Sequence, residues 1–311
     1  MSSIALCIPA FNAAWCLPRL LESANNQSIP FNEILVYDDC STDNTREVAV
    51  KYGAKVITGR VNKGCAFGKN QLAAVAQSDW LHFHDADDEL LPNFTQVAHK
   101  WINSESAPDI ILLNYNYIDF NSNEPIGSAN FNRNDLLDDT SKFVIVNKIV
   151  NFAICKKLSF LSIGGFNQNT EVLYNEDRAF YTRALLHQLR FDYEPIITCI
   201  NYRYAQSMSA SNMLKCAQAY YHVSVELANA LGHRYPTEIA ECFWKNAQLS
   251  AQYKDWTLTR KNIIGARKLQ SKAPASGNKF FNLICTFFPM FAHQLREFNI
   301  RLLKPQLRSE Q

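Results

Sequence analysis

Short apolar runs alternate with helix-like patterns over the first 85 residues of the chain. Four of these runs are apolar almost throughout, as expected of strands buried on both faces of a sheet; they lie at residues 4–8, 34–37, 55–58 and 80–84. Between them, Leu17, Leu20 and Leu21 recur at helical spacing, and further helices are predicted over 43–52 and 66–77. This alternation predicts an α/β fold with a mostly parallel central sheet flanked by helices.

The pattern changes after residue 85. The chain then predicts a strand over 109–118, a polar loop over 121–134, a helix over 177–187, and one or two strands over 190–204. From about residue 214 onward the pattern is helical and carries no strand or turn signals. We therefore predict a first domain over 1–213, with halves 1–100 and 101–213, and a helical C-terminal region over 214–311.

Composition narrows the class of protein. The 311 residues include 20 Phe, 13 Tyr and 5 Trp, which is too aromatic for a disordered chain. A net charge of only +2 argues against a protein that coats nucleic acid. Nine cysteines, none at CxxC spacing, are typical of buried thiols in a reducing compartment. We expect a cytoplasmic protein, because no apolar run reaches the ~18 residues of a membrane span and the N-terminus lacks a signal pattern.

The C-terminal part of the chain is basic and rich in phenylalanine. Residues 254–311 carry a net charge of +8, against −6 for the remainder. This segment has two interpretations: a peripheral contact with an anionic membrane, or a helical region that packs on the first domain or mediates homodimerisation. We favour packing on protein, because Pro289 interrupts the helical pattern and the apolar residues do not form one clean stripe.

Three carboxylates in four residues follow the predicted strand at 80–84. Asp85, Asp87 and Asp88 repel one another, which costs folding free energy unless a cation or hydrogen-bond donors compensate. At the carboxyl end of a buried strand, such a turn forms an oxygen site that suits Mg²⁺ or Mn²⁺ bound to a diphosphate. The alternative is an acidic loop that caps the helix near Pro92. The position after a buried strand favours the metal site.

A second polar segment follows the strand at 34–37. Asp39 could accept hydrogen bonds from a nucleobase or ribose, while Asp43 or Ser41 serves as the N-cap of the next helix. The segment after the first strand, Pro9-Ala10-Phe11-Asn12, indicates only a turn by itself. His82 and His84 share one face of their strand, where hydrogen-bonded core histidines are the favoured interpretation over metal ligands.

Taken together, these segments resemble the family 2 glycosyltransferases of GT-A fold. The resemblance spans about residues 3–95 and rests on Ile8-Pro9-Ala10-Phe11-Asn12, Val36-Tyr37-Asp38-Asp39-Cys40-Ser41-Thr42-Asp43, Asn62-Lys63-Gly64 through Lys69-Asn70, and Asp85-Ala86-Asp87-Asp88, in that order. A weaker match continues through Gly164-Gly165-Phe166-Asn167, Glu176-Asp177, and Tyr202-Arg203. Each motif alone is common, but the ordered set is specific.

The resemblance implies a nucleotide-diphospho-sugar transferase with a Rossmann-like GT-A domain, of which 1–100 binds nucleotide and 101–213 binds acceptor. It implies an inverting, metal-dependent, hexosyltransferase-type enzyme that uses Mn²⁺ or Mg²⁺. The donor would be a nucleotide sugar, a UDP-sugar foremost, and the acceptor a hydroxyl of a glycan or lipid-linked glycan. Capsule, exopolysaccharide or lipopolysaccharide biosynthesis is the implied setting, in the cytoplasm or peripherally on the inner face of the membrane.

The resemblance also implies a role for individual residues. Asp177 matches the general base, Asp87 the direct metal ligand, and Asp85 a ligand that reaches the metal or the ribose. The donor-binding residues implied are Pro9, Ala10, Phe11, Asn12, Asp38, Asp39, Lys69, Asp85 and Ala86. The acceptor-binding residues implied are Gly164, Gly165, Phe166 and Glu176.

Two departures from the family pattern keep an alternative open. Lys69 stands where many relatives have arginine, and Ala205 and Gln206 stand where relatives often place a histidine. The alternative is a catalytically inactive nucleotide-sugar-binding subunit of a larger synthase. Asp177 likewise has a second interpretation, as a plain N-cap of the helix that follows it.

Overall fold

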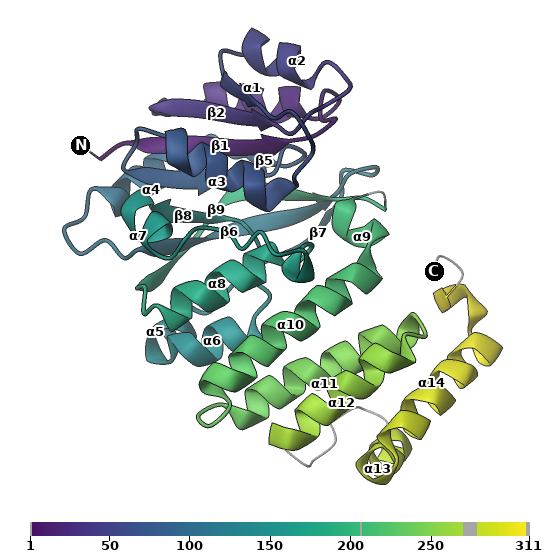
Figure 1. Cartoon of the computed structure of the whole chain (residues 1–311). Helices are drawn as coiled ribbons and strands as arrows, with labels where there is room; N and C mark the ends of the chain where they lie inside the picture. Colours follow the sequence, from purple (N-terminus) through teal and green to yellow (C-terminus); the bar gives the residue numbers. More distant parts are fainter. Residues whose placement is uncertain (1, 206, 270–278, 309–311) are drawn as a thin grey trace. The chain divides into compact units, whose positions relative to one another are not determined.

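One nine-stranded mixed sheet organises the first two-thirds of the chain (Figure 1). The computed structural model describes residues 2–205, 207–269 and 279–308. Its strand order is β3-β2-β1-β4-β8-β6-β9-β5, with β7 paired to β6. The first four strands are parallel to one another: β1 (Ile4–Ala10), β2 (Glu33–Asp38), β3 (Lys55–Thr58) and β4 (Trp80–Phe83). The predicted α/β fold, with a central sheet flanked by helices, is confirmed.

The second half of the sheet mixes directions. It consists of β5 (Glu89–Leu90), β6 (Ile110–Asp119), β7 (Pro125–Ser128), β8 (Ala153–Lys156) and β9 (Phe191–Arg203). Strand β8 is antiparallel to both β4 and β6, whereas β9 runs parallel to β6. The predicted polar loop over 121–134 is wrong in part, because it contains β7. This strand is exposed over three of its four residues, so it carries no apolar pattern to reveal it.

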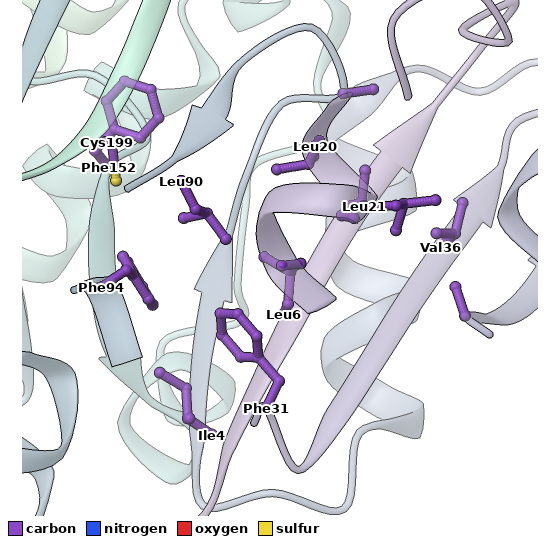
Figure 2. Packing of buried hydrophobic residues seen from close by; sticks show 14 of the residues in the cluster. Ile4, Leu6, Leu20, Leu21, Phe31, Val36, Leu90, Phe94, Phe152 and Cys199 are labelled. Atoms are coloured by element: carbon purple, nitrogen blue, oxygen red, sulfur yellow. The ribbon is translucent and has the colours of Figure 1, made fainter. Parts of the chain in front are cut away.

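Helices cover both faces of the sheet with apolar side chains. They are α1 (Leu17–Asn25), α2 (Thr45–Lys51), α3 (Cys65–Val75), α4 (Phe94–Ile102), α5 (Arg133–Asp138), α6 (Thr140–Val146), α7 (Lys157–Ser162) and α8 (Glu176–Leu186). In α1, Leu17, Leu20 and Leu21 are fully buried, as their spacing predicts. Figure 2 shows Leu20 and Leu21 beside Leu6 of β1, and Phe94 of α4 belongs to the same one of two core clusters. A second core cluster contains Phe83, Phe160, Phe166 and Phe180.

The chain divides into two compact units. The first unit contains residues up to Val144, Lys148–Gln168 and Glu176–Ser207, and the second contains Ile145–Asn147, Asn169–Asn175 and the chain from Met208 onward. The second unit is helical, as predicted: η1 (Thr170–Val172), α9 (Met208–Ser211), α10 (Met213–Leu231), α11 (Pro236–Gln252), α12 (Trp256–Leu269), α13 (Lys279–Phe287), α14 (Pro289–Leu303) and η2 (Pro305–Arg308). Within the described parts of the chain, no helix has both the length and the apolar character needed to cross a membrane.

Candidate active site

The segments that follow β1 and β2 are bonded to each other. Pro9 and Ala10 end β1 in register with Tyr37 and Asp38 of β2. Beyond them, the backbone N–H of Asn12 donates to Ser41 Oγ at 2.9 Å, and Asn12 Oδ1 accepts from the Thr42 N–H at 2.8 Å. Asn12 adopts a left-handed backbone conformation (φ 49°), which asparagine tolerates better than most residues. The carboxyl ends of two parallel strands therefore form one continuous rim, along which Phe11 is half exposed.

Asp38 and Asp39 are buried, and their carboxylates accept hydrogen bonds from backbone N–H groups. Asp38 Oδ1 accepts from the Ser41 N–H at 3.0 Å, which shapes its own loop. Asp39 accepts from the N–H groups of Lys63 and Gly64, with the shortest bond 2.7 Å long. Gly64 is the N-cap of α3 and has a φ of +86°. Asp39 thus fixes the start of the helix that carries Lys69, a role that the sequence did not indicate.

Lys69 lies at the centre of the candidate site. Its side chain is only 1% exposed, yet its Nζ lies 3.4 Å from Asp177 Oδ1 and 3.6 Å from Asp85 Oδ1. Nζ is also 4.9 Å from the centre of the Phe166 ring. These partners come from the turn after β4, the start of α8 and the segment before it. One buried ammonium therefore brings together residues expected to serve the donor, the proton transfer and the acceptor.

The charges around Lys69 perturb one another. Burial raises the pKa of Asp177 to about 7, against the lowering effect of Lys69; nearby Glu176 and Asp85 raise it further. Burial alone would lower the pKa of Lys69, but Asp177, Asp85 and Glu176 outweigh burial and raise it well above the ordinary lysine value. A carboxyl group that titrates near neutral pH is suited to accept a proton during catalysis. Asp177 lies in the first turn of α8, one residue after the helix begins.

The three aspartates after β4 have different surroundings. The Asp85 side chain is 43% exposed and faces Lys69. Asp88 is buried and accepts from Asn201 Nδ2 and the Tyr202 N–H, so it anchors the turn to β9. Asp87 Oδ2 accepts from the Tyr204 hydroxyl at 2.5 Å. The backbone carbonyl of Asp87 accepts from Arg19 Nη2.

The donor set of this turn fits a hard divalent cation. Burial, and then the charge of Asp85, raise the pKa of Asp87, so the two carboxylates repel each other in the absence of a counter-ion. A cation held by oxygens of Asp85 and Asp87 would remove that repulsion, and carboxylate oxygens are the ligands that Mg²⁺ and Mn²⁺ prefer. Ala86 packs its side chain into the core, so its backbone alone can meet a donor. Asp88 is already fully engaged by β9.

The Gly164–Phe166 segment is fixed against α3. Asn70 Nδ2 donates to the Phe166 carbonyl, and Asn70 Oδ1 accepts from the Phe166 N–H, both at 2.8 Å. Gly165 has a φ of +65°, and a Cβ there would lie 2.4 Å from Asn70 Oδ1, so no side chain fits. The Phe166 ring is 3% exposed among Phe83, Phe160 and Phe180. Phe166 therefore shapes the wall beside Lys69 with its buried ring.

His82 and His84 are fully buried in the sheet. His82 Nδ1 contacts the Ala153 carbonyl, and its Nε2 contacts His84 Nδ1, both at 2.9 Å. Burial lowers the pKa of His82 to about 4, so the pair is neutral at physiological pH. Cys199 lies close enough for the three side chains to offer a metal-ligating group within 4.8 Å of one another. The bond between the two rings is the arrangement expected of core histidines.

Two residues of the site had no signal in the sequence, and the role of a third was not predicted. Tyr204 and Arg19 each contact Asp87, and Asn70, part of the segment that resembles the family, holds Phe166. Arg19 also stacks its guanidinium 3.9 Å from the centre of the Tyr202 ring. These contacts join segments 68 to 117 residues apart, and no local spacing predicts such contacts. All of the site residues described above belong to the first unit.

This combination of fold and site is that of a GT-A glycosyltransferase: a sheet whose first four strands are parallel, an acidic turn after β4, and an aspartate at the start of a helix beside it. Residues 5–163 match the family described as glycosyl transferase family 2, about half of the chain. The chain therefore belongs to glycosyl transferase family 2, which confirms the resemblance inferred from the sequence.

Named relatives and solved structures agree with this assignment. An uncharacterized glycosyltransferase of Haemophilus influenzae is 27% identical over 223 residues, which cover 66% of this chain and 71% of the relative. Chondroitin synthase of Pasteurella multocida is 34% identical over 101 residues, 31% of this chain and 10% of that protein.

The solved structures share the fold at low sequence identity. TarS (residues 1–349) of S. aureus, in complex with UDP-GlcNAc, aligns with a TM-score of 0.62 and 17% identity over 87% of this chain and 91% of TarS. A mannosyltransferase of Pyrobaculum calidifontis, in complex with GDP-Man and Mn²⁺, aligns with a TM-score of 0.60 and 15% identity over 99% of this chain and 84% of that one.

Proposed function

We propose that this glycosyltransferase is metal-dependent and inverts the anomeric configuration of the sugar it transfers. The observation that carries the proposal is the position of Lys69 Nζ, 3.4 Å from Asp177 and 3.6 Å from Asp85. The two carboxylate oxygens are therefore no further apart than the sum of these distances. A diphosphate held at Asp85 and Asp87 would place the anomeric carbon within reach of a hydroxyl beside Asp177.

In the proposed reaction, Asp177 accepts the proton of the acceptor hydroxyl as its oxygen bonds to the anomeric carbon. The bond from that carbon to the donor phosphate breaks on the opposite face, and the nucleoside diphosphate leaves with the electron pair. Lys69 orients Asp177 and lies beside the developing negative charge on the diphosphate. A bound Mn²⁺ or Mg²⁺ would add charge stabilisation of the leaving group as a Lewis acid, held by Asp87 and Asp85.

The proposed donor is a nucleotide sugar, with a UDP-sugar as the first candidate. The rim at Pro9–Asn12 offers a half-exposed aromatic ring at Phe11 for a base. Asp38 and Asp39 are buried, so we expect them to serve the donor through the backbone segments that they hold in place. The complex of TarS with UDP-GlcNAc supports a uridine nucleotide, and the Pyrobaculum complex with GDP-Man makes guanosine the alternative. Mn²⁺ in that second complex supports manganese as the cofactor.

The proposed acceptor is a hydroxyl of a glycan or lipid-linked glycan. Phe166 lies beside Lys69, Gly164 and Gly165 lead into it along the chain, and buried Glu176 precedes Asp177 in α8. The match to chondroitin synthase supports a role in surface polysaccharide biosynthesis, such as a capsule, exopolysaccharide or lipopolysaccharide. A lipid-linked acceptor would bring the enzyme to the inner face of the membrane, with peripheral contact or homodimerisation through the C-terminal region.

One contact favours the alternative function, a catalytically inactive nucleotide-sugar-binding subunit of a larger synthase. Lys69 forms an ion pair with the very carboxylate that must accept a proton. If Lys69 stays bound to Asp177 when the donor is present, the base would be neutralised and transfer would fail. Turnover separates the two functions, because a binding subunit retains nucleotide-sugar affinity and releases no nucleoside diphosphate.

The test is a panel of UDP-, GDP- and dTDP-sugars with Mn²⁺ or Mg²⁺, read by release of nucleoside diphosphate and by thermal shift. We expect one donor to raise the melting temperature and to be hydrolysed slowly. Asp177→Asn should keep donor binding and lose turnover, whereas Asp138→Asn, an exposed carboxylate on α5, should change neither. Undiminished turnover in Asp177→Asn would contradict the proposed base, and binding without hydrolysis would establish the alternative function.

A further inference from the structure

The last long helix, α14, exposes large apolar side chains on one face and buries polar side chains on the opposite face, the reverse of the usual arrangement. The side chains of Phe291, Phe298 and Leu302 are 56%, 64% and 65% exposed. They stand at positions i, i+7 and i+11, which is one face of a helix. On the opposite face, His293 and Glu297 are 1% and 2% exposed. A helix in water normally buries its large apolar residues and exposes its charges.

Polar contacts hold this orientation. Glu297 Oε1 accepts from Arg296 Nη1 at 2.9 Å, and both Glu297 carboxylate oxygens accept from Arg308, at 2.9 and 3.0 Å. Arg301 Nη2 of α14 donates to the Gln252 carbonyl of α11 at 2.8 Å. Rotation of α14 to bury Phe291 and Phe298 would break the bond to α11 and move the Glu297 ion pairs into water. The outward position of the phenylalanines is therefore part of the packed structure of the second unit.

The preceding helix also exposes large apolar side chains. Leu283 and Phe287 of α13 are 61% and 66% exposed, and Phe288 at the junction with α14 is 68% exposed. In α13 the buried side chain is Cys285. Together with Phe291, Phe298 and Leu302, these three residues define a surface that we name the phenylalanine face. Six large apolar side chains, each more than half exposed on two consecutive helices, exceed the scattered exposure normal for a soluble protein.

Charge distinguishes between the two occupants that could cover this face. Residues 254–311 carry a net charge of +8. A second copy of the chain, related by a twofold axis, would place two such segments against each other, and like charges at an interface oppose association. An anionic lipid surface attracts the same segment, and each lysine or arginine near it contributes favourably. Lys279 and Lys304, at the outer ends of the two helices, are both exposed.

We propose that the phenylalanine face docks the protein peripherally on an anionic lipid bilayer. The helices lie in the interface, with phenylalanine and leucine side chains in the acyl boundary and basic residues at the headgroups, as amphipathic interfacial helices do. This differs from the packing on protein that Pro289 suggested in the sequence: the proline separates two helices, and each of them still presents an apolar stripe. The inference stands without the proposed transfer reaction, because it uses none of the active-site residues.

The test is flotation of the full chain with vesicles of equal parts phosphatidylglycerol and phosphatidylcholine, compared with phosphatidylcholine alone. We expect flotation with the anionic vesicles and loss of most of it at high salt, since salt screens the attraction. The double variant Phe291→Ser, Phe298→Ser should weaken binding to the anionic vesicles at least tenfold, because each ring then no longer leaves water. Lys279→Glu with Lys304→Glu should weaken binding to anionic vesicles only.

The matched control is Leu158→Ser with Ile126→Ser, which removes two apolar side chains of the first unit that are 74% and 59% exposed. We expect the control to float like the unaltered protein. We also expect the control and the Phe291→Ser, Phe298→Ser variant to keep the melting temperature of the unaltered protein. Equal flotation of the phenylalanine variant and the control would overturn the proposal. A second result would also overturn it: the unaltered protein is a dimer at every concentration measured, Phe291→Ser, Phe298→Ser is a monomer, and neither of these two proteins floats. That result would assign the face to a second copy of the chain. Nucleotide-sugar hydrolysis is measured in a separate assay without lipid, so a failure to hydrolyse the donor would count against the proposed function and not against membrane docking.

Discussion

Replacement of Lys69 by methionine isolates the most consequential charge in the active site. Methionine keeps the length and the apolar stem of the side chain but removes the ammonium, which lies 3.4 Å from Asp177 Oδ1. Coulomb's law at that distance gives about 1 kcal/mol at the dielectric constant of water and about 5 kcal/mol at an effective value near 20. Because one pKa unit corresponds to about 1.4 kcal/mol, loss of Lys69 raises the pKa of Asp177 by about 1 to 4.

Solvent keeps the expected shift near the lower end of that range. The Asp177 side chain is 25% exposed, so water screens part of the interaction. The proposed base, Asp177, can accept a proton only when it is ionised, and its pKa is already raised to about 7. Turnover of the unaltered enzyme should therefore fall as the pH drops through about 7. In Lys69→Met the same fall should move to higher pH by about one unit or more.

The assay is the pH dependence of kcat/KM for nucleoside diphosphate release, with one donor held below saturation. Lys69→Arg restores the positive charge and should return the acidic limb toward its original position. Lys100→Met removes an exposed lysine of α4 and should leave the profile unchanged. An acidic limb that stays in place, or moves to lower pH, in Lys69→Met would refute the claim that this ammonium sets the ionisation of the base.

Two further changes test other parts of the site. Tyr204→Phe removes the hydroxyl that donates to Asp87 and should weaken Mn²⁺ binding about 10- to 100-fold, as loss of an outer-shell partner does. The control is Tyr202→Phe, which removes a hydroxyl bonded to Glu89. Equal Mn²⁺ affinities of the two variants, measured by titration, would contradict a role for Tyr204 in orienting Asp87. Gly165→Ala should lower the free energy of unfolding by about 2 kcal/mol or more, because its Cβ would lie 2.4 Å from Asn70 Oδ1 and the backbone there is left-handed. An unchanged midpoint of denaturant unfolding would show that the segment can shift to accept the Cβ without loss of stability.

The sequence predicted the parts of the site that depend on local order. Asp38, Asp39, Asp85 and Asp87 each follow a strand of the parallel half, and the carboxyl ends of parallel strands meet at one edge of the sheet. The helical C-terminal region was likewise evident from its periodicity. These features need only the alternation of apolar and polar residues along short stretches of chain.

Other parts of the structure depend on contacts that no local pattern encodes. Lys69 was expected to bind the donor, but it also pairs with Asp177, 108 residues further along the chain. Tyr204 reaches Asp87 across 117 residues. The exposed strand β7 has no apolar alternation, so its pairing with β6 was missed. The second unit also recruits residues 145–147 and 169–175 from within the first domain predicted from sequence.

The burial of Phe166 limits how this part of the candidate site can be altered. Its ring is enclosed by Phe83, Phe160 and Phe180, and its backbone is clamped by Asn70. Substitutions of Phe166 would therefore lower the stability of the fold, and this loss would mask any change of selectivity. Laboratory evolution aimed at new acceptors should leave this position constant and draw its diversity from exposed residues instead.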